Sequence, residues 1–231
     1  MLKVPTTMAA LLIASATAVY AADVPVFPVP IPPPPPPPAS PAFNWTGPYF
    51  GALVGYAWGD KEWDAFGGAP VTHGVAGWLA GIEAGYRFQS GALVFGVEGD
   101  WAWTNATGMS SCAAGAYDCR TDINWLGTLT GQVGFAAGRL LVYAEAGAAV
   151  ANENFTAAGL TTYEGDLTNW GWLLGVGAAV SLADNVYLKA EYNYMNFGTD
   201  TVDPFTDGIG NAPFDLTQTI HRATVGIGFR F

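Results

Sequence analysis

The sequence predicts an all-β protein, an eight-stranded antiparallel transmembrane β-barrel with short periplasmic turns and long extracellular loops. Three observations lead to this prediction. Bulky apolar residues alternate with small or charged residues in eight successive segments. The connections between these segments are alternately short and long, as in outer-membrane barrels. The chain combines 30 Gly and 14% aromatic residues with only 12% charged residues, which is unusual for a soluble surface.

The first four alternating segments lie in the first part of the expected barrel. They cover residues 49–58, 77–88, 93–103 and 123–135. One side of each segment is bulky and apolar, and the other carries glycine, threonine or ionisable residues. In the fourth segment, Ile123 and Trp125 fall on the apolar side, opposite Thr128. Each segment therefore presents two chemically distinct faces as a strand, with the period of two that strand geometry requires.

The last four segments repeat the pattern. They cover residues 139–150, 169–182, 185–197 and 221–231, and the first of these is less regular than the others. Each of the eight segments has about ten residues or slightly more, close to the ~9–11 that a tilted strand needs to cross a bilayer. An even number of strands is expected for a single-chain bacterial barrel.

The connections give an independent signal of the same fold. After the second, fourth and sixth segments the chain turns within a few residues, at "QSG", "AAG" and "ADN". After the first, third, fifth and seventh it runs through long polar segments, among them 59–73, 152–166 and 198–216. Short turns at one end and long loops at the other are typical of membrane barrels.

The ionisable residues decide which face of the strands points inward. Nine of them fall opposite the bulky residues: Glu83, Arg87, Glu98, Asp100, Glu145, Lys189, Glu191, Arg222 and Arg230. An Arg or Lys facing lipid at the bilayer midplane costs on the order of 2–4 kcal/mol, so these charges must face the lumen. An eight-stranded barrel is just wide enough for side chains to fill its interior. We therefore expect a lumen ion-pair network, in which the pairing of acids with bases depends on the barrel shear.

Aromatic residues mark the two water interfaces of the expected barrel. Six tryptophans lie near the long-loop ends of their segments: Trp58, Trp101, Trp103, Trp125, Trp170 and Trp172. Phe88, Phe135 and Phe231 lie near the short-turn ends. Six tryptophans at one level and on one face are better explained by an interfacial girdle than by a packed core.

The N-terminal part of the chain is expected to lie outside the barrel. Residues 1–21 have the positive start, short apolar core and small-residue cleavage site of a secretory signal peptide. Residues 22–42 are a proline-rich linker with seven consecutive prolines, Pro32 to Pro38, and cannot join a helix or a central strand. We expect a stiff polyproline II spacer in the periplasm, with peptidoglycan as its candidate partner. Residues 43–231 form the barrel.

Export to an oxidising compartment favours a disulfide between the two cysteines, Cys112 and Cys119. Two thiols without a nearby histidine are an incomplete metal site. The acidic loops lack the spacing of a dedicated calcium loop. The sequence thus predicts no metal site and no cofactor. Its net charge of -11 makes nucleic acid an unsuitable partner.

Several stretches resemble the small outer-membrane porin-like β-barrels of alphaproteobacteria, a RopB-like group of OmpA-like eight-stranded barrels. These stretches are "FNWTGPYFGALVGYAWG", "GWLAGIEAGYRF", "YLKAEYNYMNFG" and the terminal "VGIGFRF". The resemblance covers residues 43 to 231 and implies a location in the outer membrane of a Gram-negative bacterium, in contact with its lipid. It also implies that the C-terminal Phe231 is presented to the outer-membrane assembly machinery. Such proteins contribute to envelope integrity and surface antigenicity, and the proline run is not a general feature of them.

The residues leave four functional hypotheses beside a structural outer-membrane role. A narrow porin-like channel fits a charged lumen, and haem or another ligand could bind the loops, where His73 is the only histidine. Enzymatic activity is not expected, because His221, Ser110 and Ser111 are scattered rather than arranged as a triad. A soluble lipid-binding barrel would crowd about six tryptophans into one interior, in contrast to the lipid-facing girdle of a membrane barrel.

Overall fold

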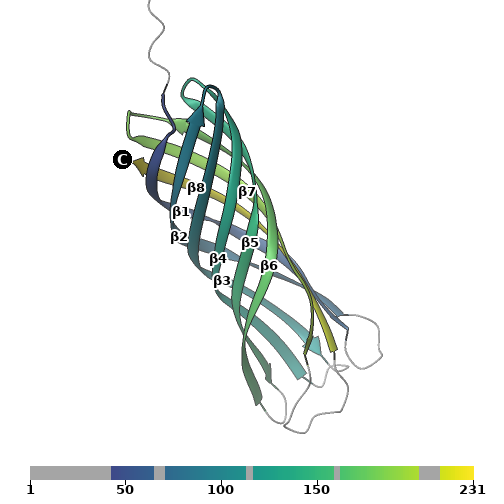
Figure 1. Cartoon of the computed structure of the whole chain (residues 1–231). Coiled ribbons are helices and arrows are strands. Elements are labelled where there is room, and N and C mark those ends of the chain that lie inside the picture. The colour runs from purple at the N-terminus through teal and green to yellow at the C-terminus, as the bar shows by residue number, and fades with distance from the viewer. Residues whose placement is uncertain (1–42, 65–70, 113–116, 159–161, 203–213) are drawn as a thin grey trace, which may run out of the picture. The chain divides into compact units, whose positions relative to one another are not determined.

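The computed structural model describes residues 43–64, 71–112, 117–158, 162–202 and 214–231, which form one closed antiparallel barrel (Figure 1). Its strands are β1 Gly47–Asp64, β2 Val71–Ser90, β3 Leu93–Cys112, β4 Tyr117–Ala137, β5 Leu140–Ala158, β6 Thr162–Ser181, β7 Val186–Val202 and β8 Phe214–Arg230. Each strand pairs with its neighbours in sequence, and β8 closes the barrel on β1. The predicted fold class is confirmed. None of the described residues belongs to a helix that is long and apolar enough to cross a membrane.

Tight turns connect the strands at the end of the barrel where the C-terminus lies (Figure 1). The β2–β3 and β4–β5 turns contain Gly91 and Gly138, each with a φ of 63°. Two-residue hairpin turns need this left-handed backbone conformation, which glycine adopts without a steric cost. In the β6–β7 turn, the amide groups of Leu182 and Ala183 both donate to the carbonyl oxygen of Val186. These turns are the ones that the sequence predicted.

The strands are much longer than the sequence predicted. They have 17 to 21 residues, and most of the segment 152–166, expected as a loop, belongs to β5 and β6. The physical reason is that strand pairing continues beyond the membrane, where the outer face no longer needs apolar side chains. The alternation that marks a strand in the sequence therefore stops before the strand does.

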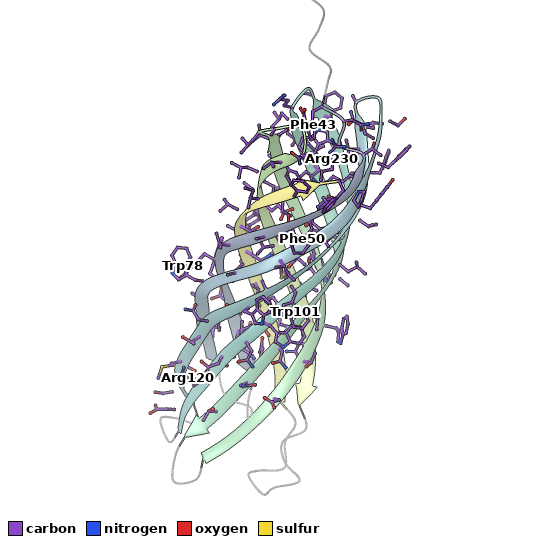
Figure 2. All side chains as sticks on the ribbon, turned by 90° about the vertical axis from the view of Figure 1, so that its left-hand side faces the viewer. Phe43, Phe50, Trp78, Trp101, Arg120 and Arg230 are labelled. Carbon is purple, nitrogen blue, oxygen red and sulfur yellow. The ribbon has the colours of Figure 1, made fainter. Side chains whose placement is uncertain are left out.

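A band of exposed apolar side chains surrounds the part of the barrel next to the tight turns. On β2 this band runs from Trp78, whose side chain is 69% exposed, to Phe88 at 55%. These two residues are ten positions apart, which at ~3.3 Å per residue and a tilt of about 40° spans roughly 25 Å, the height of the apolar band of outer-membrane barrels. Figure 2 shows Trp78 projecting from the wall. The apolar face therefore points outward. The end of the band at Trp78 marks the membrane interface on the extracellular side.

One strand departs from the expected alternation of faces. Ile123 was expected on the lipid-facing side of β4, but it is buried inside the barrel with 2% exposure. Ile123 pairs with Glu153 and Trp125 with Asn152, so β4 has one extra residue here relative to β5. Such a bulge reverses the faces of all residues beyond it. Trp125 itself is half-buried and stacks on Trp101 with 3.9 Å between ring centroids.

The interior of the barrel is layered along its axis. On β5 the inward residues run from Leu141 and Tyr143 through Glu145 to Ala149 and then to Glu153. Leu141 and Tyr143 belong to one buried apolar cluster and Ala149 to a second. Polar residues lie between the two clusters, and a second polar layer follows toward the extracellular end. The lumen is thus a packed core in which polar and apolar layers alternate.

Candidate functional site

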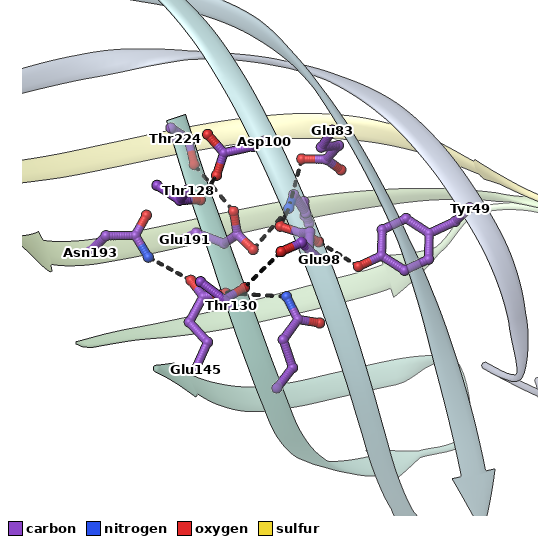
Figure 3. A network of polar contacts seen from close by, with 12 residues as sticks. Tyr49, Glu83, Glu98, Asp100, Thr128, Thr130, Glu145, Glu191, Asn193 and Thr224 are labelled. Atoms are coloured by element: carbon purple, nitrogen blue, oxygen red, sulfur yellow. Dashed lines mark hydrogen bonds and ion pairs between the residues drawn. The ribbon is translucent and has the colours of Figure 1, made fainter. Parts of the chain in front are cut away.

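A lysine surrounded by three carboxylates forms the centre of the polar core. The Nζ atom of Lys189 on β7 lies 2.7 Å from Glu83 on β2, and 2.8 Å from both Glu98 on β3 and Glu191 on β7. All four side chains are at most 3% exposed. The ammonium group donates charge-assisted hydrogen bonds to Glu98 and Glu191, and it forms an ion pair with Glu83. Figure 3 shows Glu83, Glu98 and Glu191 turned toward one another from different strands.

This arrangement also explains a cluster that has the ligand spacing of a metal site. The carboxylate oxygens of Glu83, Glu98 and Glu191 lie within 4.8 Å of one another. The ammonium group of Lys189 contacts all three and supplies the positive charge that a metal ion would bring. The prediction that the chain has no metal site stays a prediction.

An arginine–aspartate pair forms the second contact of the polar core. Arg222 on β8 donates to Asp100 on β3 through two nitrogen atoms, with Nη1–Oδ1 at 2.6 Å and Nη2–Oδ2 at 2.9 Å. Its Nε atom donates to Asn193 at 3.0 Å, and the hydroxyl of Thr128 also bonds to Asp100. A two-pronged pair of this kind fixes the guanidinium plane. It connects opposite regions of the wall across the lumen.

Arg87 lies between the polar core and a ring of tyrosines on the periplasmic side. Its guanidinium carbon lies 4.3 Å from the ring centre of Tyr49 and 5.3 Å from those of Tyr143 and Tyr187. Its Nη2 atom lies 3.5 Å from Glu98. Stacking on aromatic faces adds to the charge interaction because the ring faces are electron-rich.

The tyrosine hydroxyls extend the network. Tyr49 donates to Glu98 at 2.6 Å, and Tyr143 donates to Glu191 at 2.5 Å. These tyrosines were not among the predicted lumen residues, although both fall on the inward-facing side of their strands. Facing glycines make room for them: a Cβ atom at Gly177 would lie only 2.5 Å from Tyr143 Cζ.

Glu145 differs from the other acids of the core because every described residue that donates a hydrogen bond to its carboxylate is neutral. It accepts from Gln132 Nε2 at 3.1 Å and from Asn193 Nδ2 at 2.5 Å. The polar core thus holds five acids, Glu83, Glu98, Asp100, Glu145 and Glu191, and three bases, Arg87, Lys189 and Arg222. Neutral amide donors stabilise the carboxylate that has no cation beside it.

Arg230 does not join this network. It is half-buried at the periplasmic rim, where it donates to the carbonyl oxygens of Thr46 and Asp184, both at 2.9 Å. Its guanidinium carbon lies 4.9 Å from the ring centre of Phe43. Eight of the nine expected lumen residues therefore come together. The ninth, Arg230, instead contacts the segment that precedes β1.

A second buried ion pair, which the sequence pattern did not predict, lies nearer the extracellular end. Lys61 on β1 lies 2.5 Å from Glu153 on β5, and the amide of Gln218 on β8 also bonds to Glu153. Lys61 is 2% exposed and Glu153 is fully buried. Residues 59–73 were expected as a loop, which hid this pair. Counting in steps of two from Leu53 through Ala57 leads to Lys61 and would have found it.

Four further expected residues lie outside the polar core or outside the described side chains. The side chains of Cys112, Cys119 and His73 lie outside the described part, so their predicted disulfide and ligand roles stay predictions. The backbone register pairs Cys112 with Tyr117 and Cys119 with Ser110. Phe231 is 74% exposed, packs against Phe229 with 5.1 Å between ring centroids, and donates its amide to Pro48.

Comparisons with known proteins agree with this architecture. The model of an outer membrane protein beta-barrel domain matches residues 8–231. A 31 kDa outer-membrane immunogenic protein of Brucella melitensis is 32% identical over 248 residues, 97% of this chain and 100% of that protein. A 22 kDa outer membrane protein of Rhizobium leguminosarum is 28% identical over 83% of this chain and 80% of its own. The crystal structure of the outer membrane protein OprG from Pseudomonas aeruginosa has a similar fold, with a TM-score of 0.52, 14% identity, and coverage of 82% of this chain and 100% of that one.

Proposed function

The chain belongs to the outer-membrane β-barrel protein family and resides in the outer membrane of a Gram-negative bacterium, and we propose that within this family it is a structural, non-conducting barrel. Its role is to support the integrity of the envelope and to present its extracellular end for surface interactions. The relatives named immunogenic support the second part of this role. Antibody labelling of intact cells tests it, and labelling only after permeabilisation would contradict it.

The observation that carries the proposal is the filled interior. The bore is crossed by the Lys189 contacts from β7 to β2 and β3, and by the Arg222–Asp100 pair from β8 to β3. Trp45 and Tyr187 are 1% exposed on the periplasmic side, so side chains also fill that level. An ion that passed through would have to displace paired charges from a poorly hydrated environment, which costs several kcal/mol per ion.

Single-channel recording tests whether the barrel conducts. The mature protein, reconstituted in a planar bilayer, should show no steady openings in salt solution. A double variant, Arg222→Ala with Asp100→Ala, removes one cross-lumen pair without leaving an unpaired charge, and should raise the frequency of openings. Steady openings of the unaltered protein would instead support the alternative, a narrow porin-like channel.

The absence of enzymatic activity is part of the same proposal. His221, the only histidine whose side chain is described, contacts aromatic rings on the lipid-facing wall rather than a serine or an acid. Its ring stacks on Trp58 with 5.7 Å between ring centroids. Ser110 and Ser111 lie at the far end of β3. Hydrolysis assays with ester and peptide substrates should give only background rates.

Residues 22–42 and Phe231 complete the proposal at the two ends of the mature chain. As a polyproline II helix at ~3.1 Å per residue, the linker would extend roughly 65 Å into the periplasm, far enough to act as a spacer toward peptidoglycan. Sedimentation with purified peptidoglycan, with and without residues 22–42, tests this contact. The exposed Phe231 is the proposed signal for the assembly machinery.

A further inference from the structure

Seven aromatic rings on the outer wall form one connected surface. Ring contacts run from Trp78 to Tyr56, Trp58, His221, Tyr194 and Trp172, with centroid separations between 5.2 and 6.3 Å. Tyr192 adds contacts to Trp58 and His221. We refer to these seven residues as the outer aromatic belt. It extends over five neighbouring strands, β2, β1, β8, β7 and β6.

His221 is fixed within the outer aromatic belt. Its ring is nearly parallel to that of Trp58, with an interplanar angle of 12°. Its Nδ1 atom shares a hydrogen bond of 2.7 Å with the hydroxyl of Tyr192. No described residue makes a hydrogen bond to its Nε2 atom. In the neutral ring that accepts from Tyr192, the proton lies on Nε2, which therefore keeps a donor for a group outside the protein.

The rest of the girdle is different. On the wall around β3 and β4, Trp101 and Trp125 form a stacked pair that no other described ring contacts. Trp103, which is 58% exposed, has no ring contact with any described residue. Separate amphipathic rings are what a general interfacial girdle requires. The outer aromatic belt is connected and contains a hydrogen-bonded imidazole, and neither feature is needed for a general interfacial girdle.

The position of the outer aromatic belt indicates what it meets. Trp58 and Trp78 lie at the extracellular end of the apolar band, at the level of the lipid headgroups of the outer leaflet. In a Gram-negative outer membrane these headgroups are phosphorylated amino sugars. Aromatic faces carry negative charge density and attract the C–H groups of a sugar ring. Asp60 and Glu62 are exposed just beyond Trp58 and repel phosphate groups, so the rings must supply the affinity through the sugar.

We propose that the outer aromatic belt is a binding site for the sugar headgroup of an outer-leaflet glycolipid. The rings of Trp58 and its neighbours stack on the sugar, and His221 Nε2 donates a hydrogen bond to a headgroup oxygen. The site holds the glycolipid on one side of the barrel only, over β6, β7, β8, β1 and β2. This inference is independent of whether the barrel conducts.

Titration of lipids into nanodiscs tests the proposal. The mature protein in phosphatidylcholine nanodiscs is titrated with rough lipopolysaccharide or with phosphatidylglycerol, and bound lipid is counted by native mass spectrometry. Lipopolysaccharide should bind, and phosphatidylglycerol should not displace it. Trp58→Ala should weaken the binding about tenfold. His221→Phe, which keeps an aromatic ring, should weaken it to a smaller degree.

Trp103→Ala is the matched control, because it removes an exposed tryptophan on β3 that makes no ring contact with the outer aromatic belt. The heat-dependent gel mobility of each variant shows whether it is folded. The proposal is overturned if Trp103→Ala weakens binding as much as Trp58→Ala, or if phosphatidylglycerol displaces lipopolysaccharide. Undiminished binding by folded His221→Phe would remove the imidazole from the site.

Discussion

The role of each charged residue in the polar core depends on the side chains that it contacts. Lys189 contacts three carboxylates whose side chains are all at most 3% exposed, and Glu145 relies on amide donors instead. The sequence placed these residues on the inward face, because charges cannot face lipid. It could not say which acid meets which base, since that depends on the register around the barrel. Arg230 is a second example. Its position in the alternating pattern puts it on the inward face of β8, but it lies so close to the end of the strand that it contacts the periplasmic rim and not the polar core.

Replacing Lys189 tests how strongly the core depends on one cation. In Lys189→Met, Glu83, Glu98 and Glu191 face one another without a counter-charge, so we expect the free energy of unfolding to fall by about 3–5 kcal/mol. Urea unfolding of the barrel in lipid vesicles, followed by tryptophan fluorescence, measures the change. Arg120→Met is the control, because Arg120 is half exposed and solvent screens its pair with Asp122, so this variant should change the free energy of unfolding little. Equal shifts for both variants would contradict this account.

Strands and turns were the most predictable level of the structure. Alternation located all eight strands, and the glycine turns at Gly91 and Gly138 fixed the short connections. The strand ends could not be predicted, because the outer face becomes polar above the membrane while pairing continues. The reversal at Ile123 could not be predicted either, since a bulge is a matter of register and leaves no mark in the pattern of apolar residues.

Packing between neighbouring strands gives a prediction about glycine. A methyl group at Gly177 on β6 would lie 2.5 Å from Tyr143 Cζ on β5, and Tyr143 bonds to Glu191. Gly177→Ala must therefore displace the tyrosine and should lower the free energy of unfolding by about 1–3 kcal/mol. At Gly131 a Cβ atom would meet only Ala146 O, at 3.9 Å, so Gly131→Ala serves as the control. Similar urea midpoints for the two variants would show that Tyr143 can move aside without destabilising the barrel, which would contradict this prediction.

The barrel as a whole combines two environments that a soluble protein keeps apart. Its outer band is apolar and its interior holds charged layers between apolar ones, so each strand alternates between lipid and a packed polar core. Closure between β1 and β8 leaves no free edge along the paired register, which hydrocarbon would not tolerate. The same closure brings the C-terminal residues beside the entry of the chain into β1.

Phe231 allows assembly to be separated from stability. Its side chain is 74% exposed and contacts Phe229, while the hydrogen bond from its backbone N–H to the carbonyl oxygen of Pro48 would persist in an alanine variant. Phe231→Ala should therefore change the urea midpoint of the refolded barrel little, yet strongly reduce the amount of folded protein in the outer membrane of cells. Phe135→Ala, which removes another exposed phenylalanine at the turn end, should leave that amount unchanged. If both variants lower it equally, membrane anchoring by aromatic side chains, rather than recognition of the terminus, governs assembly.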